Sequence, residues 1–555
     1  MNLFKFLVVL IGCVHPFFIR MGFAQESISK EVRVFKPYEP TLSDAFKVNI
    51  LPVIEDTVEY LTNFDYSITP KAFMPEYKIR PIRPAKIVGE PLEKLYNTLL
   101  KLGIGSYVTP YAELSINSLR SRKYSAGVFA KHISSQGKVK LDNHKKVYAG
   151  YSDNDLLFYG KKFVKNAVLT GDIGLKYNLV HFYGYNPVII DTVLDKKDIK
   201  QDFLLLTGQT GFQSTHNDST HLNYNVSLKY DFFRDHNKGV ENSIQFQGSF
   251  ARLFNKQFLG TDISLMYIDK SINIDSTYNA VVNFSPWFSK NTAEWSLKAG
   301  IDIAFDITGN QTKPCFYPKA KLQFNIVENY LSTYVGIDGQ LEVNHYRKIA
   351  GENPFITPGL HVKNSDHKLM VYGGFLGNIS SSTSFKLSAK WELVDDMYFF
   401  INDTLSVLGN QFYAEYDDVE VKNIYGELAA SPGEKLSFVL KGNYYQYKMS
   451  TQDRPWHKPT WDIILSARYN LRNKILLNAD VVAESKQYAR NYGTLLPNEI
   501  QMDKLIDLSL GIEYRYTKIL SAFLRFYNIT SSQYAKWNQY PTQRFFLMAG
   551  FTYAM

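Results

Sequence analysis

The chain has 555 residues, a formal net charge of +9, a mean hydropathy of −0.22 and an aromatic content of 15%. After residue 25 no uninterrupted apolar run reaches about 18 residues, which excludes a membrane-spanning helix. The positive charge is spread without a basic block, so no nucleic-acid partner is expected. Cys13 and Cys315 are too few for a disulfide framework or a cysteine metal cluster.

Residues 1–25 have the layout of a secretory signal peptide. An early cation precedes an apolar stretch over residues 6–18, and small residues come before the charged Glu26. We therefore predict export. The alternative is a lipoprotein signal acylated at Cys13, but only about seven apolar residues precede that cysteine, at the short limit of a signal-peptide core.

Residues 26–95 are predicted to form a short proline-rich periplasmic or lumenal segment. This segment holds eight of the 21 prolines of the chain. Proline lacks a backbone donor and cannot continue a helix, so these residues exclude long strands and long helices. Three roles are open: a solvated linker, a strap that fills a lumen, or a docking segment for a periplasmic partner.

From residue 96 to residue 555, polar and apolar residues alternate with the period of two that is typical of strands. Clear examples are residues 221–232, 295–306, 385–393 and 506–516. A large secreted sandwich or propeller also alternates, but its strands average about 5–6 residues. The longer segments favour an all-β transmembrane antiparallel β-barrel with a polar lumen and an apolar exterior.

The connections between these segments alternate between short and long, as periplasmic turns and extracellular loops do in membrane barrels. Counting strands in this way gives about 22, within a range of about 20–24, and an even number returns both ends to the periplasm. The first strand is predicted over Lys101–Leu119. Short turns are predicted at 254–257, 289–292, 328–329, 366–368, 394–396, 431–435, 472–474 and 517–518, and longer loops at 185–201, 403–417, 450–459, 484–502 and 528–543.

Charged residues alternate with the aromatic and aliphatic residues of these strands, so in a barrel they would face the lumen. Charges that line a pore set its selectivity. The candidates for this role are Lys229, Asp231, Lys298, Asp302, Lys386, Lys390, Glu513 and Arg515. For each residue taken alone, a solvated or paired lumen side chain is the alternative.

The last twelve residues, 544–555, form a strand with one apolar face that includes Phe551, Tyr553 and Met555. This ending resembles the closing strand of bacterial outer-membrane β-barrels, which the barrel-assembly machinery recognises as a targeting signal. Such strands usually end in phenylalanine, so Met555 is a departure from the pattern. We predict that Phe551, Tyr553 and Met555 form the assembly signal.

Two further motifs support a family resemblance. Asn353-Pro354-Phe355 follows a strand predicted to end at Tyr346, and Trp537-Asn538-Gln539-Tyr540-Pro541 runs into the closing strand. Together with the strand number, they make residues 96–555 resemble the barrel part of TonB-dependent-receptor-like outer-membrane proteins. The resemblance implies solute transport across the outer membrane of a Gram-negative cell. Family members carry a plug of well over a hundred residues, whereas residues 26–95 form a much shorter segment.

A barrel of about 22 strands normally needs something to block its lumen. An empty lumen of that width would breach the permeability barrier of the membrane. Residues 26–95 could fold into the lumen, a partner could fill it, or lumen side chains and long loops could constrict it. The sequence leaves these three options open.

One short motif raises the question of enzymatic activity. His132 and Ser134 share the mostly apolar face of a strand predicted over Tyr124–Ser134, and residues 132–137, HISSQG, resemble the His-x-Ser pair of outer-membrane phospholipases and lipid A deacylases. A base beside a hydroxyl is the minimum for acyl transfer. The sequence assigns no third, orienting residue. We also find no HExxH, GxSxG, phosphate-binding glycine loop or metal-ligand spacing, so no catalytic residues, metal site or cofactor are predicted.

The function predicted from the sequence is a channel or transporter that moves an unidentified solute across the cell outer membrane. The expected partners are membrane lipid, the barrel-assembly machinery and a periplasmic protein bound by residues 26–95. One alternative is a non-transporting barrel that anchors or scaffolds a periplasmic or surface complex through this segment. A further alternative is a barrel enzyme that acts on lipid.

Overall fold

The computed structural model describes residues 95–555, apart from residues 120, 142–143, 186–192, 217–220, 272–273, 275–276, 404–407 and 491–498. The signal peptide predicted over residues 1–25 and the proline-rich segment, except for residue 95, lie outside the described residues. Both therefore stay predictions.

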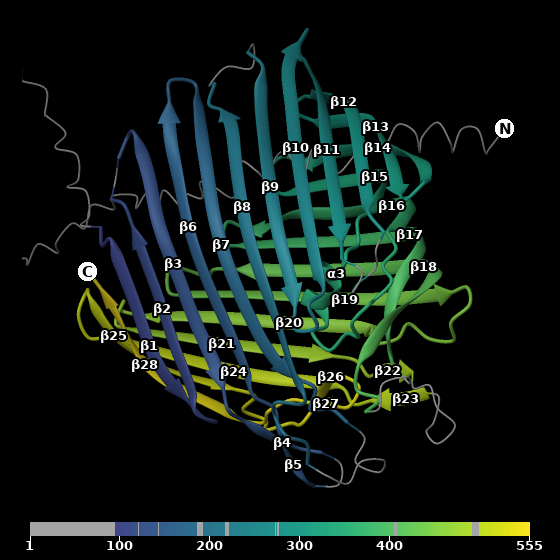
Figure 1. Ribbon diagram of the computed structural model, residues 1–555. Coiled ribbons are helices and arrows are strands. Elements are labelled where there is room, and N and C mark those ends of the chain that lie inside the picture. The colour runs from purple at the N-terminus through teal and green to yellow at the C-terminus, as the bar shows by residue number, and fades with distance from the viewer. Residues whose placement is uncertain are drawn as a thin grey trace, which may run out of the picture. The chain divides into compact units, whose positions relative to one another are not determined.

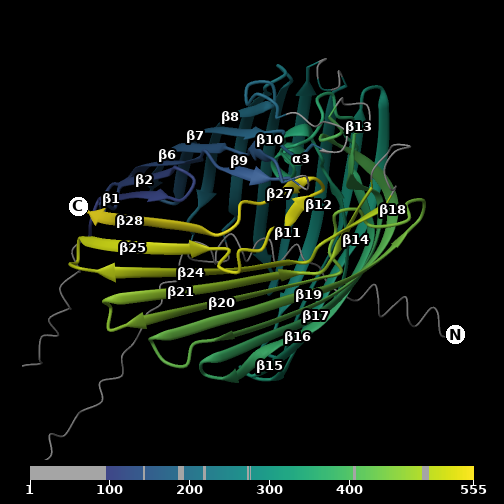
Figure 2. The same ribbon diagram turned by 90° about the horizontal axis from the view of Figure 1, so that it is seen from below.

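The described chain forms one closed antiparallel β-barrel (Figures 1 and 2). A 22-stranded sheet follows the order of the chain, and its last strand pairs with its first, so the sheet has no open edge. The predicted fold class and strand number are thus confirmed. The wall strands are β1 (Thr98–Gly105), β2 (Thr109–Asn117), β3 (Tyr124–Ser135), β6 (Tyr151–Val164), β7 (Ala167–His181), β8 (Lys200–Ser214), β9 (Asn223–Asp235), β10 (Val240–Phe254), β11 (Gln257–Lys270), β12 (Asn279–Asn291), β13 (Trp295–Thr308), β14 (Gln311–Val327), β15 (Leu331–Glu342), β16 (Ser365–Ser380), β17 (Thr383–Asn402), β18 (Phe412–Ala430), β19 (Leu436–Met449), β20 (Trp461–Leu471), β21 (Ile475–Glu484), β24 (Leu505–Arg515), β25 (Leu520–Tyr527) and β28 (Phe546–Ala554).

The outer face of the barrel is apolar. Ile173, Phe316 and Phe551 expose 68%, 60% and 44% of their surface, and further large aliphatic and aromatic side chains are exposed on the same face of the other strands. Exposed apolar surface on this scale is covered by lipid in a membrane barrel. Closure suits that setting, because in hydrocarbon every backbone polar group must be paired within the protein. No helix in the described part of the chain is long and apolar enough to cross a membrane.

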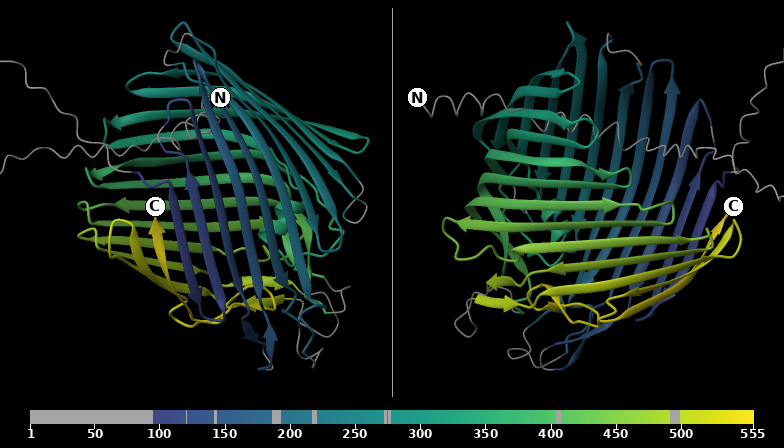
Figure 3. Two further views of the ribbon diagram at one scale, coloured as in Figure 1. Left: turned by 60° about the vertical axis from the view of Figure 1, so that its left-hand side comes forward. Right: turned by 180° about the vertical axis from the view of Figure 1, so that it is seen from behind.

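The two ends of the barrel differ in their connections (Figure 3). At the turn end, which holds the start of β1 and the end of β28, connections are short, such as residues 255–256 and 472–474. At the loop end, three long connections contain small hairpins of their own, and a fourth contains a helix. These elements are β4 (Lys138–Lys140) with β5 (Lys146–Tyr148), β22 (Gln487–Arg490) with β23 (Glu499–Met502), β26 (Ala535–Trp537) with β27 (Tyr540–Pro541), and α3 (Tyr346–Glu352).

Two predicted turns, residues 366–368 and 394–396, were wrong, because both stretches lie inside long strands. The pairing of β16 with β17 shifts between His367 and Leu369, and the pairing of β17 with β18 shifts between Val394 and Met397. These shifts are β-bulges, which need the same departure from extended backbone as a turn. Asp396 has a φ of 52°. The true turn between β16 and β17 lies at residues 381–382.

Other predicted boundaries moved as well. Residues 101–119 form no single strand, because β1 and β2 are two halves of a hairpin that turns at Tyr107 and Val108, with φ values of 60° and 51°. Bulky and β-branched residues rarely adopt positive φ, so Tyr107 and Val108 argued against a turn, although Gly105 and Ser106 precede them. β12 extends into the turn predicted at 289–292, and β18 begins within the loop predicted at 403–417.

The seam between β1 and β28 depends on a pair of glycines. Gly103 lies opposite Gly550, and a Cβ on Gly550 would stand 2.2 Å from the Leu102 carbonyl oxygen and 2.4 Å from the Phe523 ring. Phe523 is buried over this seam together with Met548. Glycine at position 550 therefore allows the two closing strands to approach.

We predict that Gly550→Ala destabilises the folded barrel, since overpacking costs about 1–3 kcal/mol. The measurement is the temperature at which the compact, heat-modifiable band on a detergent gel converts to the unfolded band. Gly426→Ala in β18 is the matched control, because a Cβ there would meet no atom within 4 Å. Equal conversion temperatures for both variants would contradict the role of Gly550.

Candidate functional site

The eight candidate lumen residues lie on the inward faces of β9, β13, β17 and β24, because their sequence neighbours Tyr230, Ile301, Leu387 and Tyr514 are exposed on the outward face. Most of these charges are compensated within the wall. The contacts are Lys229 to Asp231 at 3.0 Å, Lys319 to Asp302 at 3.2 Å, Lys390 to Glu392 at 2.7 Å, Arg515 to Glu513 at 3.9 Å, Lys298 over the Trp287 ring at 3.7 Å and Lys386 over the Tyr425 ring at 5.5 Å. Of the four lysines in this set, Lys386 is the exposed one.

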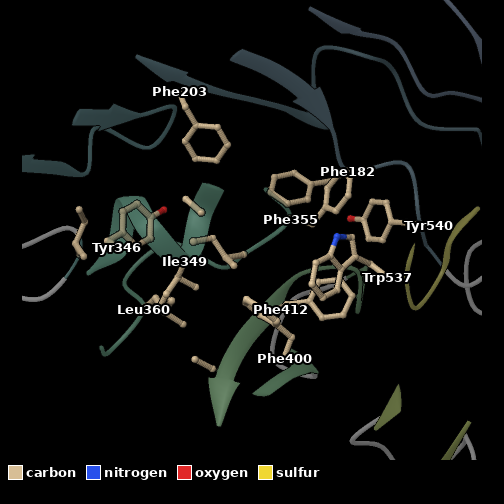
Figure 4. Close-up of a cluster of buried hydrophobic side chains, with 14 of the residues drawn as sticks. Phe182, Phe203, Tyr346, Ile349, Phe355, Leu360, Phe400, Phe412, Trp537 and Tyr540 are labelled. Carbon is tan, nitrogen blue, oxygen red and sulfur yellow. The ribbon is translucent and has the colours of Figure 1, made fainter. Parts of the chain in front are cut away.

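The inside of the loop end is occupied by connections that fold inward (Figure 2). We call this inward-folded layer the cap and define it as residues 343–364, which contain α3, together with the described residues of the connections 182–199, 403–411 and 528–545. Its core is a cluster of buried side chains shared with the adjoining strand ends (Figure 4). The cluster consists of Phe182, Ile199, Phe203, Phe233, Ile274, Tyr346, Ile349, Ala350, Phe355, Ile356, Leu360, Phe400, Phe412, Ala414, Trp537 and Tyr540.

The two motifs that suggested a family resemblance meet in this cluster. The rings of Phe355 and Tyr540 stack with their centroids 3.7 Å apart, and Figure 4 shows both beside Trp537. The Asn353 side chain accepts a hydrogen bond from the Phe355 backbone at 3.0 Å, which fixes the turn after α3. The strand predicted to end at Tyr346 is shorter, because β15 ends at Glu342 and Tyr346 begins the helix.

Carboxylates of the wall hold one side of the cap helix. Glu241 at the start of β10 accepts hydrogen bonds from His345 Nδ1 and the Tyr346 backbone, each at 2.7 Å, and from the Arg347 backbone at 3.4 Å. The Tyr346 hydroxyl donates to Asp235 at 2.8 Å. Burial, with Asp235 nearby, raises the pKa of Tyr346 well above 10, so the phenol stays a donor. Asp231 also binds Arg347 at 3.1 Å.

The other side of the cap helix is tied to the opposite part of the wall. Glu352, the last residue of α3, accepts a hydrogen bond from Tyr398 of β17 at 2.6 Å and pairs with Lys458 at 3.2 Å. The chain after the helix also joins the sheet, because the Phe412 backbone donates to the Phe355 carbonyl at 2.9 Å. The helix thus bridges the interior between β9–β10 and β17–β18.

Below the cap, toward the turn end, the lumen keeps open space. A cavity of about 940 Å³ lies along the inner wall of β19–β25. Its polar lining includes Lys101, Ser437, Arg468, Asn470, Asn478, Asp480, Ser509, Glu513 and Arg525. Charges of both signs therefore face this part of the lumen. Among the described residues, no group of three or more histidine, cysteine, aspartate or glutamate side chains forms a potential metal site.

No protein-family model matches the chain, and no curated protein matches it. Solved structures do match. The FrpB iron transporter from Neisseria meningitidis aligns with a TM-score of 0.66 at 9% identity over 84% of this chain and 82% of that one. The ferripyoverdine receptor of the outer membrane of Pseudomonas aeruginosa gives 0.62 at 11% over 84% and 72%, and the copper transporter OprC gives 0.63 at 10% over 84% and 82%.

At these identities the likeness concerns the fold. The chain has the barrel fold of outer-membrane receptors and transporters, which confirms the predicted resemblance of residues 96–555 to the barrel part of TonB-dependent receptors. The predicted setting, an outer membrane, agrees with this fold and with the apolar outer face of the barrel.

The first prediction for the cap concerns Glu241. Glu241→Ala leaves three donors of the helix start without their acceptor, and a buried donor left unsatisfied costs about 1–3 kcal/mol. We expect faster hydrogen exchange in residues 345–353, measured by mass spectrometry, while the barrel strands stay protected. Glu427→Gln, on the inward wall of β18 away from the cap, is the control. Unchanged hydrogen exchange in Glu241→Ala would show that Glu241 does not hold the start of the helix in place.

The second prediction concerns pH. His457 lies in the loop after β19, donates from Nδ1 to the Phe400 carbonyl at 2.9 Å and accepts from the Asn538 backbone at 3.2 Å. Burial lowers the pKa of His457 to about 4, and Lys458 acts in the same direction. The folded cap therefore favours the neutral ring. Its contribution to stability is complete above about pH 6.5 and is lost as the pH falls toward 4.

The size of this contribution is roughly 3 kcal/mol, from 1.36 kcal/mol for each unit of pKa shift. We expect hydrogen-exchange protection of residues 537–540 to fall between pH 6.5 and 4 in the wild type. In His457→Gln, which cannot gain a proton, that protection should depend less on pH. The same pH dependence in both proteins would show that another group controls the cap.

Proposed function

We propose that this protein is an outer-membrane transporter whose extracellular mouth is closed by the cap and opens to pass a solute. One observation carries the proposal. A closed 22-stranded barrel holds a packed, cross-tied layer at its loop end and a polar cavity of about 940 Å³ toward its turn end. In the orientation predicted from the connection lengths, the loop end faces the outside of the cell.

The width of the barrel supports a gate in place of a permanent pore. Barrels of about 22 strands normally carry something that blocks the lumen. Of the three options open from the sequence, constriction by loops is the one that the described residues support. A contribution of residues 26–95 to the blocked state remains a separate prediction, as does the alternative in which this segment anchors a periplasmic or surface complex.

The solute is a further proposal. The similar structures are described as an iron transporter, a ferripyoverdine receptor and a copper transporter. Metal-bearing solutes are therefore the first class to test, although the fold alone carries over to this chain. We also propose that the inward charges tune selectivity, with Lys386 the strongest candidate because it is exposed to the lumen and most of the other charges are paired.

The test is to replace residues 345–360 with a short glycine-serine linker and to record currents in planar lipid bilayers. Removal of the cap helix should give a large, steady conductance where the intact protein gives little. Replacement of the turn 431–435 with a linker of matched composition is the control, and it should leave the conductance low. Equal conductance with and without the cap helix would refute the gate.

The opened variant also tests the lumen charge. Lys386→Glu on that background should shift the reversal potential in a salt gradient toward cation selectivity. Lys448→Glu lies on the outward face of β19, with its side chain 81% exposed, and serves as the control. Equal shifts in the two variants would show that Lys386 has no special role in the lumen.

A further inference from the structure

The outer face of β3 and β6 carries a polar group that transport does not use. His132 of β3 lies directly opposite Asn154 of β6, and Ser134 lies opposite Ser152. All four point outward, because Tyr124 and Phe158 on the same face are 59% and 48% exposed while Ile133 packs inside against the cluster of Tyr111, Phe523 and Met548. The group therefore faces the lipid side of the barrel.

Three of these side chains form a hydrogen-bonded chain. Ser134 Oγ lies 3.1 Å from His132 Nε2, and His132 Nδ1 lies 2.6 Å from Asn154 Oδ1. The sequence had suggested the His–Ser pair and had assigned no orienting residue. The register of β3 with β6 supplies one, because it places Asn154 beside His132 across the ladder.

The orientation of the Asn154 amide determines which atoms of the three hydrogen-bonded side chains carry protons. The Asn154 amide nitrogen donates to the Tyr177 carbonyl and to Ser152 Oγ, each at 3.1 Å, and a carbonyl can only accept. Asn154 Oδ1 must then face the imidazole, so His132 Nδ1 carries the proton and donates it. His132 Nε2 is left with its lone pair toward Ser134, whose hydroxyl donates to it. This is the tautomer that a general base needs.

The position on the barrel suits a lipid substrate. β3 runs toward the loop end, so His132 and Ser134 lie near its end, beyond Val128 and Ala130 on the same face. Among the outward residues in register with this group, Ala112 of β2 and Leu179 of β7 are apolar, whereas Asp202 of β8 binds Lys200 at 2.7 Å. The group thus lies where the apolar exterior gives way to polar residues. In a bilayer this is the level of the ester bonds that join acyl chains to headgroups.

We propose that Ser134, His132 and Asn154 form a lipid-facing acyl-hydrolase site, with the acyl ester of a membrane lipid as its substrate. Ser134 Oγ attacks the ester carbonyl while His132 Nε2 takes the hydroxyl proton and passes it to the departing alcohol. The acyl group is then bound to Ser134. A water molecule, deprotonated by His132, attacks this second ester, and the fatty acid leaves as Ser134 regains its proton. Asn154 positions the imidazole and does not touch the substrate.

This activity is independent of the proposed transport. It uses the outside of the wall between β3 and β6, whereas transport uses the lumen and the cap. The alternative is that the three side chains only satisfy each other at the end of a strand. A structural role of that kind predicts neither a reactive serine nor turnover.

The first test is fatty-acid release by the full-length protein in lipid vesicles. One set of vesicles contains phosphatidylethanolamine and phosphatidylglycerol, and a second set contains purified lipopolysaccharide. Release in either set that falls about 1,000-fold or to background in Ser134→Ala and His132→Ala supports the site and identifies the source of the ester. No release in either set, or release that persists in Ser134→Ala, overturns it.

The second test separates chemistry from folding. A fluorophosphonate probe should label Ser134 in the wild type, with the modified residue identified by mass spectrometry, and labelling should disappear in His132→Ala. Ser125→Ala, on the inward face of β3, should keep both labelling and activity. Each variant is first checked for the heat-modifiable band of a folded barrel. A folded wild type without labelling at Ser134 overturns the proposal.

A third test compares fatty-acid release by two variants of Asn154. Asn154→Ala should lower fatty-acid release by a smaller factor than Ser134→Ala, since removing an orienting group costs less than removing the nucleophile. Asn154→Asp keeps an acceptor for the Nδ1 proton and should restore release. If both substitutions had the same effect, Asn154 would not act by orienting His132.

Discussion

The structure depends on one constraint, which is that every backbone hydrogen-bonding group of the wall must be paired within the wall. The ladder between β1 and β28 meets this constraint by closing the sheet, and Leu99 to Gly105 pair in continuous register with Ala554 to Met548. Small residues at the seam, Gly103 opposite Gly550, let these strands approach. Once the sheet is closed, alternation along each strand separates a lipid-facing side from a lumen side, and all further features lie on one side or the other.

The lumen side creates the next problem, because closing 22 strands encloses a space too wide to leave empty. In the described residues the cap occupies this space at the loop end, and its apolar core is built from segments between residues 182 and 540. The core alone would not fix the position of α3. Hydrogen bonds to the wall do so, with the wall carboxylates Glu241 and Asp235 on one side and Glu352 of the helix bound to Tyr398 on the other. The same inward faces thus supply both a polar lumen and the anchors of its closure.

Much of the barrel follows from local sequence, and the cap does not. Period-two alternation located strands such as β9, β13 and β24, since that signal depends only on which face a residue occupies. Where the backbone departs from extended geometry, local signals were ambiguous. The bulge at Asp396 looked like a turn, and the hairpin turns at Tyr107 and Val108, residue types that rarely adopt positive φ.

Contacts between residues far apart in the sequence could not be predicted from such local patterns. Glu241 and His345 are 104 residues apart, and nothing near either one indicates the other. Asn154 became visible only through the register of β6 against β3, because a shift by one residue would place it in the lumen. The aromatic motifs around Phe355 and Tyr540 stood out in the sequence, but only the structure shows that they stack on each other.

The measurement that tests this account most directly is the conductance of the intact, full-length protein in a planar lipid bilayer at neutral pH. If the cap closes the lumen, the protein shows little current, with brief openings to a much larger level that report movement of the cap. A steady conductance of the size expected from an unobstructed barrel of 22 strands would contradict the account, because the cap would then be no barrier.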